Sequence, residues 1–235
     1  MKAFYQRQLH RGGLVSILVN PYYFARKGLF ELIKNYAKNI DGRILDVGCG
    51  KKPYRSLFAC SEYIGLEIDT EEGNKNNSAD FFYNGESIPF DDASFDAIIC
   101  NQVLEHVFSP DSFISELHRV LKAGGKMILS VPFVWDEHEQ PRDFARYTSF
   151  GLKHILQKNG FDIISSDKTC ADSSVIFQLI NAYIFKIFQT EYVVFNIIYT
   201  LLLIAPVNIL GLVISKVFPK NNDLYLDNVV LAKRR

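Results

Sequence analysis

The stretch Arg43-Ile-Leu-Asp-Val-Gly-Cys-Gly-Lys-Lys52 carries the strongest fold signal in the chain. Its apolar run stops at a Gly-x-Gly, which predicts a buried strand that ends in a tight turn and opens a helix. Glycine suits this turn because a Cβ would keep the backbone away from a bound ligand. The third glycine of a dinucleotide-binding loop is missing, since Pro53 stands three residues after Gly50. The acid Asp46 lies in the strand end instead, which favours a ligand that carries a cation near the turn.

Composition limits the class of protein. A chain of 235 residues allows one large domain, or a domain with an appendage. The 26 basic residues balance the 26 acidic ones, so net charge gives no argument for a nucleic-acid partner. The four cysteines form no C-x-x-C pair, which argues against a zinc site and favours a reduced, cytoplasmic setting. The short apolar run Leu14–Val19 has no cleavage site, and we expect no signal peptide.

Apolar periodicity predicts alternating strands and helices between residues 43 and 165. The expected strands are Arg43–Val47, Tyr63–Asp69, Phe81–Tyr83, Phe95–Cys100, Lys126–Val131, Phe161–Ser165 and Asp227–Ala232. The expected helices are 21–39, Ser109–Leu121, ended by Gly124-Gly125, and Thr148–Asn159, and Thr70–Asn77 is expected to be a loop. Alternation of this kind predicts an α/β fold with a doubly wound, mostly parallel sheet. Ligands of such sheets bind at the carboxyl ends of the strands, where four polar clusters fall: Asp46–Gly50, Glu67–Asp69, Asn84–Glu86 and Asn101-Gln102.

Six motifs of this chain are similar, in order and spacing, to those of the class I S-adenosylmethionine (SAM) methyltransferases. They are Leu45–Gly50, Gly65–Glu67, Ser87–Phe90, Phe95-Asp96, Val103–His106 and Arg119–Gly125. The resemblance implies SAM as cofactor and a Rossmann-like sheet whose last strand runs antiparallel to Phe161–Ser165. It divides the chain into an N-terminal helical segment (1–40), a SAM-binding core (41–170), an apolar helical insertion (171–222) and the last strand of the core (223–235).

The resemblance also implies roles for the residues of the first two motifs. Asp46 would lie near the methionine amino group of SAM, where a carboxylate matches a cation. Gly48 and Gly50 would let the backbone approach the cofactor. Cys49 between them belongs to the same cofactor-binding turn, and its side chain is interpreted as packing rather than as a nucleophile. Glu67 ends the second strand, where a carboxylate can accept hydrogen bonds from both ribose hydroxyls.

Two further strand ends complete the predicted cofactor site. At the adenine edge, where the family often has Asp, this chain has Asn84, and the register leaves Gly85 and Glu86 as alternatives. Asn101 and Gln102 would close the fourth strand and face the sulfonium.

The pair Glu105-His106 follows three residues after Gln102. A metal site there would need further carboxylate and histidine ligands, and Gln102 is a poor substitute. We therefore interpret Glu105 and His106 as structural or cofactor-adjacent residues and expect no metal.

The polar and aromatic segment Val131–Thr148 follows the fifth strand and is expected to form the acceptor side of the site. Locally it resembles a bacterial methyltransferase subgroup often met beside cell-surface polysaccharide and lipid genes. His138 is the candidate general base, because histidine titrates near neutral pH; the alternative is a hydrogen bond that orders the loop. Asp143 and Arg146 are expected to form a pair that fixes the loop, and Tyr147 and Trp135 to line the acceptor pocket or cover the core.

The last third of the chain is strongly apolar. Between residues 173 and 215 only Lys186 and Glu191 are charged, and Pro206 and Asn208 are expected to interrupt the longest apolar run. Three interpretations remain open for this segment. It lies in the membrane interface or dips into the bilayer as a hairpin, it caps the acceptor pocket, or it forms a homodimer interface.

We therefore expect an enzyme that moves a methyl group from SAM to a hydroxyl of a sugar-containing or lipid-linked small molecule. Its place would be the cytoplasm or the inner face of the cell membrane. The alternatives are a methyltransferase for a quinone-like lipophilic molecule and a non-catalytic SAM-fold protein that docks at a membrane or partner. The intact set of Asp46, Gly48, Gly50 and Glu67 argues against the last of these.

Overall fold

The computed structural model describes residues 12–70 and 78–235, so most of the predicted loop Thr70–Asn77 lies outside the described residues. Contacts divide the chain into two compact units. The sheet unit contains Ile33–Asp167 and Asn228–Arg235, and the helical unit contains the chain up to Leu32 together with Lys168–Asp227. The beginning of the chain thus groups with the apolar segment near its end, and α3 (Tyr23–Ala37) continues from one unit into the other.

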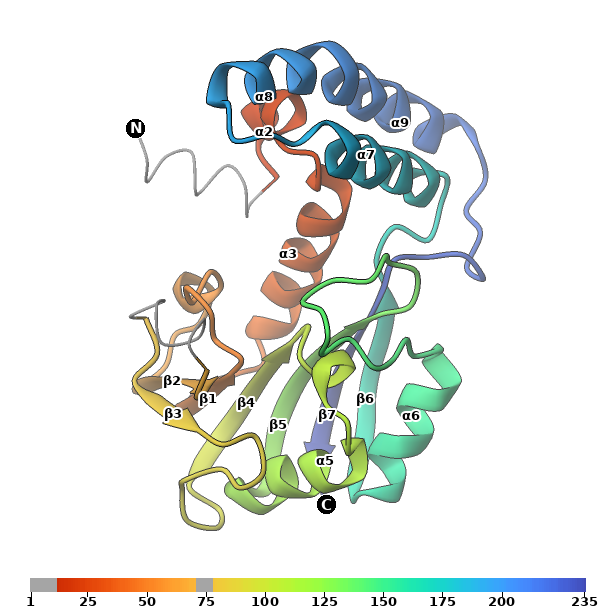
Figure 1. The fold of residues 1–235 in the computed structure, drawn as a ribbon. Coiled ribbons are helices and arrows are strands. Elements are labelled where there is room, and N and C mark those ends of the chain that lie inside the picture. The colour runs from red at the N-terminus through yellow and green to blue at the C-terminus, as the bar shows by residue number, and fades with distance from the viewer. Residues whose placement is uncertain (1–11, 71–77) are drawn as a thin grey trace. The chain divides into compact units, whose positions relative to one another are not determined.

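The sheet unit is built on a seven-stranded sheet (Figure 1). Its strands are β1 (Arg43–Val47), β2 (Glu62–Ile68), β3 (Phe81–Tyr83), β4 (Phe95–Asn101), β5 (Leu121–Pro132), β6 (Phe161–Lys168) and β7 (Asp227–Arg234). The spatial order is β3-β2-β1-β4-β5-β7-β6, and the pairs from β3 to β5 are parallel. In Figure 1 β7 runs against its neighbours, and beyond its end Arg235 N–H donates to the Gly160 carbonyl just before β6 (3.1 Å). The predicted doubly wound, mostly parallel sheet with an antiparallel last strand is confirmed.

Helices α5 (Pro110–Val120) and α6 (Ser149–Lys158) pack on the sheet because each has an apolar face that is buried there. Helix α5 buries Phe113, Ile114, Leu117 and Val120 in the same core as the inner residues of β1, β4 and β5. Helix α6 starts at Thr148, whose hydroxyl accepts the Gly151 N–H (3.1 Å). Two short 3₁₀ turns, Arg55–Leu57 and Leu104–His106, follow β1 and β4.

One predicted boundary was wrong. The glycine pair Gly124-Gly125 was expected to end the helix, but α5 already ends at Val120 and both glycines lie inside β5. The backbone of Leu121 is extended (φ −80°, ψ 137°), so the chain enters the strand directly from the helix.

The strand order fixes where a ligand can bind. From β1 the chain moves to one side of the sheet, through β2 and β3, and then returns to the other side at β4. Neighbouring loops therefore leave in opposite directions above β1 and β4, which opens a crevice at their carboxyl ends. The residues that follow β1 and β4 therefore line the position where a ligand is expected to bind.

The helical unit consists of α2 (Leu14–Val19), the first part of α3, α7 (Ser174–Phe188), α8 (Val193–Tyr199), a π-helical segment (Thr200–Ile204) and α9 (Ala205–Val217). The predicted interruption was wrong, because Val193–Val217 is one continuous helix of 25 residues. Pro206 lies in the first turn of α9, directly after the π-helical segment, whose altered hydrogen bonding accommodates a residue without an N–H. By length and composition alone this helix could cross a membrane, and 33% of its apolar window is buried.

Polar side chains fill the interior of the helical unit. Asn208 is fully buried; its amide donates to the carbonyls of Ile17 (2.8 Å) and Asn20 (3.1 Å), and its oxygen accepts from Asn181 (2.8 Å). Gln178, also fully buried, accepts from two N–H groups of α3 and donates to the Pro21 carbonyl. These contacts explain why Asn208 does not break the helix, since its side chain is satisfied by neighbouring segments.

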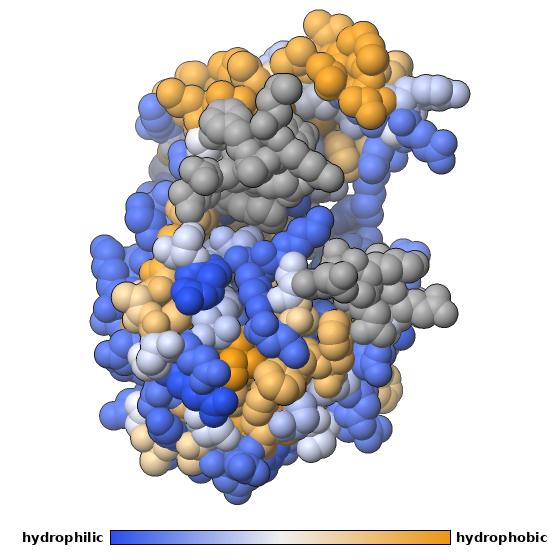
Figure 2. Space-filling model, turned by 90° about the vertical axis from the view of Figure 1, so that its left-hand side faces the viewer, coloured by the Kyte–Doolittle hydropathy of each residue, from blue (hydrophilic) through white to orange (hydrophobic). Residues whose placement is uncertain are grey.

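Apolar side chains cover the outside of the same unit. Figure 2 shows hydrophobic residues crowded at the top of the view, where Figure 1 labels α8 and α9. The largest exposed fractions among them belong to Tyr192, Val194, Val193, Leu202 and Val217. A patch of this extent on a chain in water would mark a surface that meets an apolar partner.

Candidate active site

The carboxylate of Asp46 lies at the carboxyl end of β1, where its side chain is almost fully buried. The Tyr63 hydroxyl donates to it (2.7 Å). Burial raises the pKa of Asp46 to about 7, because the loss of hydration outweighs the hydrogen bond from Tyr63 and the charge of Lys52. A cation bound beside Asp46 would lower this pKa and favour the ionised carboxylate.

The two glycines of the first motif have different surroundings. Both have positive φ, 66° at Gly48 and 45° at Gly50. A Cβ on Gly48 would lie 2.3 Å from Val103 Cγ2, whereas a Cβ on Gly50 would meet no atom within 4 Å. Gly48 therefore serves the packing of the turn against the segment after β4. Gly50 is the glycine that leaves open space for a ligand.

Glu67, on β2, holds this turn in place. One carboxylate oxygen accepts the Gly50 N–H (3.0 Å) and the other accepts the N–H of Ile68 (3.1 Å). Each oxygen retains a free lone-pair direction, so hydrogen bonds from vicinal hydroxyls remain possible at the same carboxylate.

Lys52 and Asp80, which were not among the predicted site residues, support the turn. The Lys52 ammonium binds Asp80 (2.6 Å), and the same Asp80 oxygen accepts the Gly65 N–H (2.7 Å). Burial alone would raise the pKa of Asp80, but these two hydrogen bonds hold it below its usual range. Lys52 crosses over Gly65, where an added Cβ would lie 2.2 Å from Lys52 Cε. The glycine of the motif Gly65–Glu67 was the sequence feature that pointed to this contact, because a side chain at position 65 would clash with Lys52.

The predicted adenine-side residues form a turn. The Asn84 side-chain oxygen accepts the N–H groups of Glu86 (2.9 Å) and Ser87 (3.3 Å), and Gly85 follows with φ 85°. Asn84 thus shapes the loop after β3, and its amide NH₂ remains the group able to meet a ligand.

Asn101 and Gln102 meet at Ser130 on the neighbouring strand. The Ser130 hydroxyl donates to Asn101 (2.7 Å) and receives the Gln102 amide (3.2 Å), and Gln102 has φ 56°. This arrangement fixes both side chains at the carboxyl ends of β4 and β5.

Cys49 is buried, and burial raises the pKa of its thiol to about 12, so it remains protonated at neutral pH and packs in the turn.

The loop after β5 is held by the Asp143–Arg146 pair, as predicted. The guanidinium donates to both carboxylate oxygens, each at 2.6 Å, and the hydrogen bond from Arg146 lowers the pKa of Asp143 to about 2. Arg146 also donates to the Asp136 carbonyl (2.8 Å). The loop is therefore closed on itself by a partly buried ion pair.

His138 lies beside this pair. Its N–H donates to Asp143 Oδ2 (3.0 Å), and its ring Nδ1 lies 3.2 Å from the Asp136 carbonyl and 3.3 Å from Asp143 Oδ2. Arg146 Nη2 is farther away, at 3.5 Å. Two acceptors at shorter range place the ring proton on Nδ1, so Nε2 carries the lone pair.

The loop also brings His138 to Glu105 and His106. One ligand atom from each of the three residues lies within 4.8 Å of the others, and the two imidazole rings are 4.8 Å apart, nearly perpendicular. Backbone hydrogen bonds secure the approach, since the Glu105 carbonyl accepts the N–H groups of Phe144 (2.9 Å) and Ala145 (3.2 Å). This contact was not predicted, because it depends on the path of a loop.

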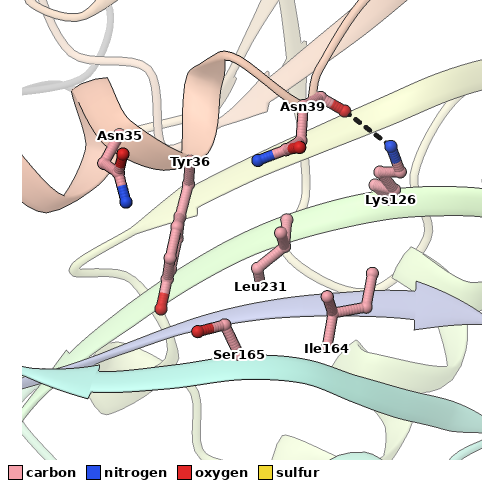
Figure 3. Close-up of a pocket in the computed structure, with 7 residues that line it drawn as sticks. All are labelled: Asn35, Tyr36, Asn39, Lys126, Ile164, Ser165 and Leu231. Atoms are coloured by element: carbon pink, nitrogen blue, oxygen red, sulfur yellow. Dashed lines mark hydrogen bonds between the residues drawn. The ribbon is translucent and has the colours of Figure 1, made fainter.

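The sheet unit also has a cavity of about 250 Å³ on another face, shown in Figure 3. It lies between the end of α3 and strands β5, β6 and β7, where Lys126 donates to the Asn39 carbonyl (2.8 Å). It contains none of the predicted site residues. The predicted cofactor residues Asp46, Gly50, Glu67 and Asn101 lie instead at the carboxyl ends of β1, β2 and β4, the edge at which ligands of such sheets bind.

The sequence of this chain is similar to those of known methyltransferases. The methyltransferase-domain family model matches residues 45–129. An uncharacterized protein of Methanocaldococcus jannaschii is 30% identical over 157 residues, which cover 61% of this chain and 75% of that protein. A probable S-adenosylmethionine-dependent methyltransferase of Mycolicibacterium smegmatis is 31% identical over 119 residues, 47% of this chain and 46% of that protein.

A solved structure shows the same fold. Phosphoethanolamine N-methyltransferase 2 of Haemonchus contortus, in complex with S-adenosyl-L-methionine, aligns with a TM-score of 0.57 at 15% identity, covering 99% of this chain and 57% of that one. This chain spans about half the length of the mycobacterial and nematode proteins. The sheet order, the cofactor edge and the sequence matches together identify the chain as a member of the class I SAM-dependent methyltransferases.

Proposed function

We propose that this methyltransferase acts on a hydroxyl group of a sugar-containing or lipid-linked small molecule. SAM supplies an activated methyl group when bound. The protein must then hold the acceptor in line with that group and remove the hydroxyl proton. Both tasks fall to the loop between β5 and α6.

The orientation of His138 carries this proposal. Its Nδ1–H faces the Asp136 carbonyl and the Asp143 carboxylate, which leaves Nε2 as a proton acceptor. A carboxylate beside an imidazole stabilises the imidazolium that forms when the base takes a proton. Since the Asp143–Arg146 pair fixes the loop, His138 is held rather than free to rotate into solvent.

A quinone-like lipophilic molecule is the second candidate acceptor. The apolar surface of the helical unit favours it, because a lipophilic acceptor partitions into the same environment as exposed Leu and Val side chains. Lipid-linked sugars and quinones share this property and differ in the polar group that would meet the loop.

We further propose that the helical unit lies in the inner face of the cell membrane. The chain leaves the sheet after β6 and returns to the adjacent β7, so both ends of the apolar segment start on one side of the bilayer. Helix α7 has 15 residues and is about 22 Å long, which is too short for a hydrocarbon core of about 30 Å. A pair of helices that lies in the interface of one leaflet satisfies both facts.

The acceptor proposal is tested with SAM and extracts fractionated into lipid, glycan and small-molecule pools. Wild type is expected to methylate a component of the lipid or glycan pool, and His138→Ala to lose about 100-fold or more in turnover with SAM affinity retained. His154→Ala, on the exposed surface of α6, is the matched control. Undiminished turnover in His138→Ala would remove that residue from the chemistry.

The membrane proposal is tested by flotation with anionic vesicles. The double variant Leu202→Glu/Val213→Glu places charges on the apolar surface and is expected to remain in the soluble fraction, whereas Asn222→Glu floats like wild type. A wild type that stays soluble and dimeric without detergent would instead identify the surface as a homodimer interface.

A further inference from the structure

We propose that Glu105, His106 and His138 form a binding site for a divalent transition-metal ion of the Zn²⁺ or Mn²⁺ class. The three residues come from two segments, the turn after β4 and the loop after β5, and one ligand atom of each lies within 4.8 Å of the others. Two imidazoles and one carboxylate match the donor types that these ions take in proteins.

Both imidazoles have the tautomer that a metal ligand needs. His106 Nδ1 lies 2.8 Å from the Arg142 carbonyl, which can only accept, so this nitrogen carries the proton. His138 Nδ1 faces the Asp136 carbonyl and Asp143 in the same way. A hydrogen bond from the other ring nitrogen is the usual support of a histidine ligand, because it fixes the ring and raises its basicity. Nε2 of each ring is thereby left for the ion.

The distances require only side-chain adjustment. Ligand atoms around a tetrahedral zinc ion are roughly 3.3 Å apart, given Zn–N distances of about 2.0 Å. His106 Nε2 lies 3.9 Å from Glu105 Oε1, and Glu105 is completely buried. The two imidazole side chains keep 15% and 28% exposure, so each can tilt slightly toward the carboxylate while it keeps its Nδ1 hydrogen bond.

The charge of the site also favours a cation. Glu105 is a carboxylate without exposed surface, a position that positive charge stabilises. Arg146 also acts on it electrostatically. Glu139 Oε2 lies 3.7 Å from His106 Nε2 and supplies a further carboxylate at the solvent side.

The site adds a chemical role that rests on the proposed function. Three protein ligands leave a coordination position for the acceptor hydroxyl, whose pKa a bound divalent ion lowers. The hydroxyl proton then leaves to solvent, the oxygen–carbon bond forms as the sulfur–methyl bond breaks, and the products are the methyl ether and S-adenosylhomocysteine. His138 acts as a ligand in this case instead of as the base.

The test is metal binding by the purified full-length chain. After chelator treatment, titration with Zn²⁺, Mn²⁺ and Mg²⁺ is expected to give one equivalent of Zn²⁺ or Mn²⁺ and no binding of Mg²⁺, which avoids imidazole ligands. His106→Ala and His138→Ala are each expected to weaken binding by at least about 100-fold. His154→Ala, an exposed histidine outside the cluster, is expected to bind like wild type.

A second readout separates the site from the reaction. Co²⁺ added to the chelator-treated chain is expected to give a visible absorption band that His106→Ala abolishes, even if Glu105→Gln fails to fold. Equal binding by wild type and both histidine variants would overturn the site. Methyl transfer to a hydroxyl that persists without metal would leave the proposed function intact and overturn the inference. One equivalent of bound metal in a chain that methylates no hydroxyl substrate would support the metal site and overturn the proposed function.

Discussion

The two units of this chain distribute their side chains in opposite ways. The sheet unit buries Leu, Ile and Phe and places carboxylates and amides at the strand ends. The helical unit buries Asn208, Asn181 and Gln178 and exposes Leu, Val and Ile. The first pattern belongs to a protein in water, and the second is expected where the surroundings are apolar and polar groups must be satisfied inside. The hydropathy of a segment alone therefore does not determine which of its side chains are buried.

The largest expected difference comes from replacing one leucine by alanine in each unit. Leu129→Ala, on β5 and fully buried, is expected to lower the free energy of unfolding by about 2–5 kcal/mol. Leu202→Ala, 68% exposed, is expected to change it by less than about 0.5 kcal/mol in detergent. Urea denaturation of both variants measures the difference. Equal losses would mean that Leu202 packs in a protein core and would break the comparison.

The polar interior of the helical unit gives a smaller effect. Asn208→Leu removes the partner of Asn181 and of two backbone carbonyls, and is expected to cost about 1–3 kcal/mol although leucine is more hydrophobic. Asn222→Leu, on the exposed segment before β7, is the control and should have little effect. A stabilised Asn208→Leu variant would show that the buried amides are dispensable. Thermal unfolding in detergent gives the measurement.

The smallest effect concerns pH at the cofactor edge. Burial raises the pKa of Asp46 to about 7, above its unfolded value of about 3.9, so only the folded state holds this proton between those two values. The ligand-free fold therefore loses stability as pH rises through this window and changes no further above about pH 7. A cation bound to Asp46 needs the ionised form, so SAM binding should release a proton.

Calorimetry checks this expectation. SAM affinity is expected to rise by up to about tenfold per pH unit below pH 7 and to level off above it. Asp46→Asn should bind SAM more weakly and without this pH dependence. An affinity of wild type that stays constant from pH 5.5 to 8 would separate Asp46 from the cofactor's charge.

Much of the sheet unit could be predicted because its signals are local. The expected bounds of Arg43–Val47 and Phe81–Tyr83 equal those of β1 and β3, since glycine turns and apolar runs mark strand ends. The Asp143–Arg146 pair was also predicted, because three residues separate a carboxylate from a guanidinium in one short loop. Residue spacing was sufficient for these features.

Features that depend on tertiary contacts could not be read in this way. The meeting of His138 with Glu105 and His106 requires the loop after β5 to fold back on the turn after β4. Lys52 reaches Asp80 only because Gly65 lacks a side chain between them. Asn208 looked like a helix breaker because its partners lie far away in sequence, on α7 and in α2.

The carbonyl of Glu105 has a consequence for how this enzyme can acquire new substrates. It receives two main-chain N–H groups of the loop, and His106 binds a third main-chain group, the Arg142 carbonyl. None of these bonds uses a side chain of the loop. Loop side chains such as that of Glu137 can therefore be exchanged while these main-chain contacts remain, and under the proposed function this would let acceptor preference diverge without rebuilding the scaffold. Libraries that vary these side chains are the natural route to altered specificity.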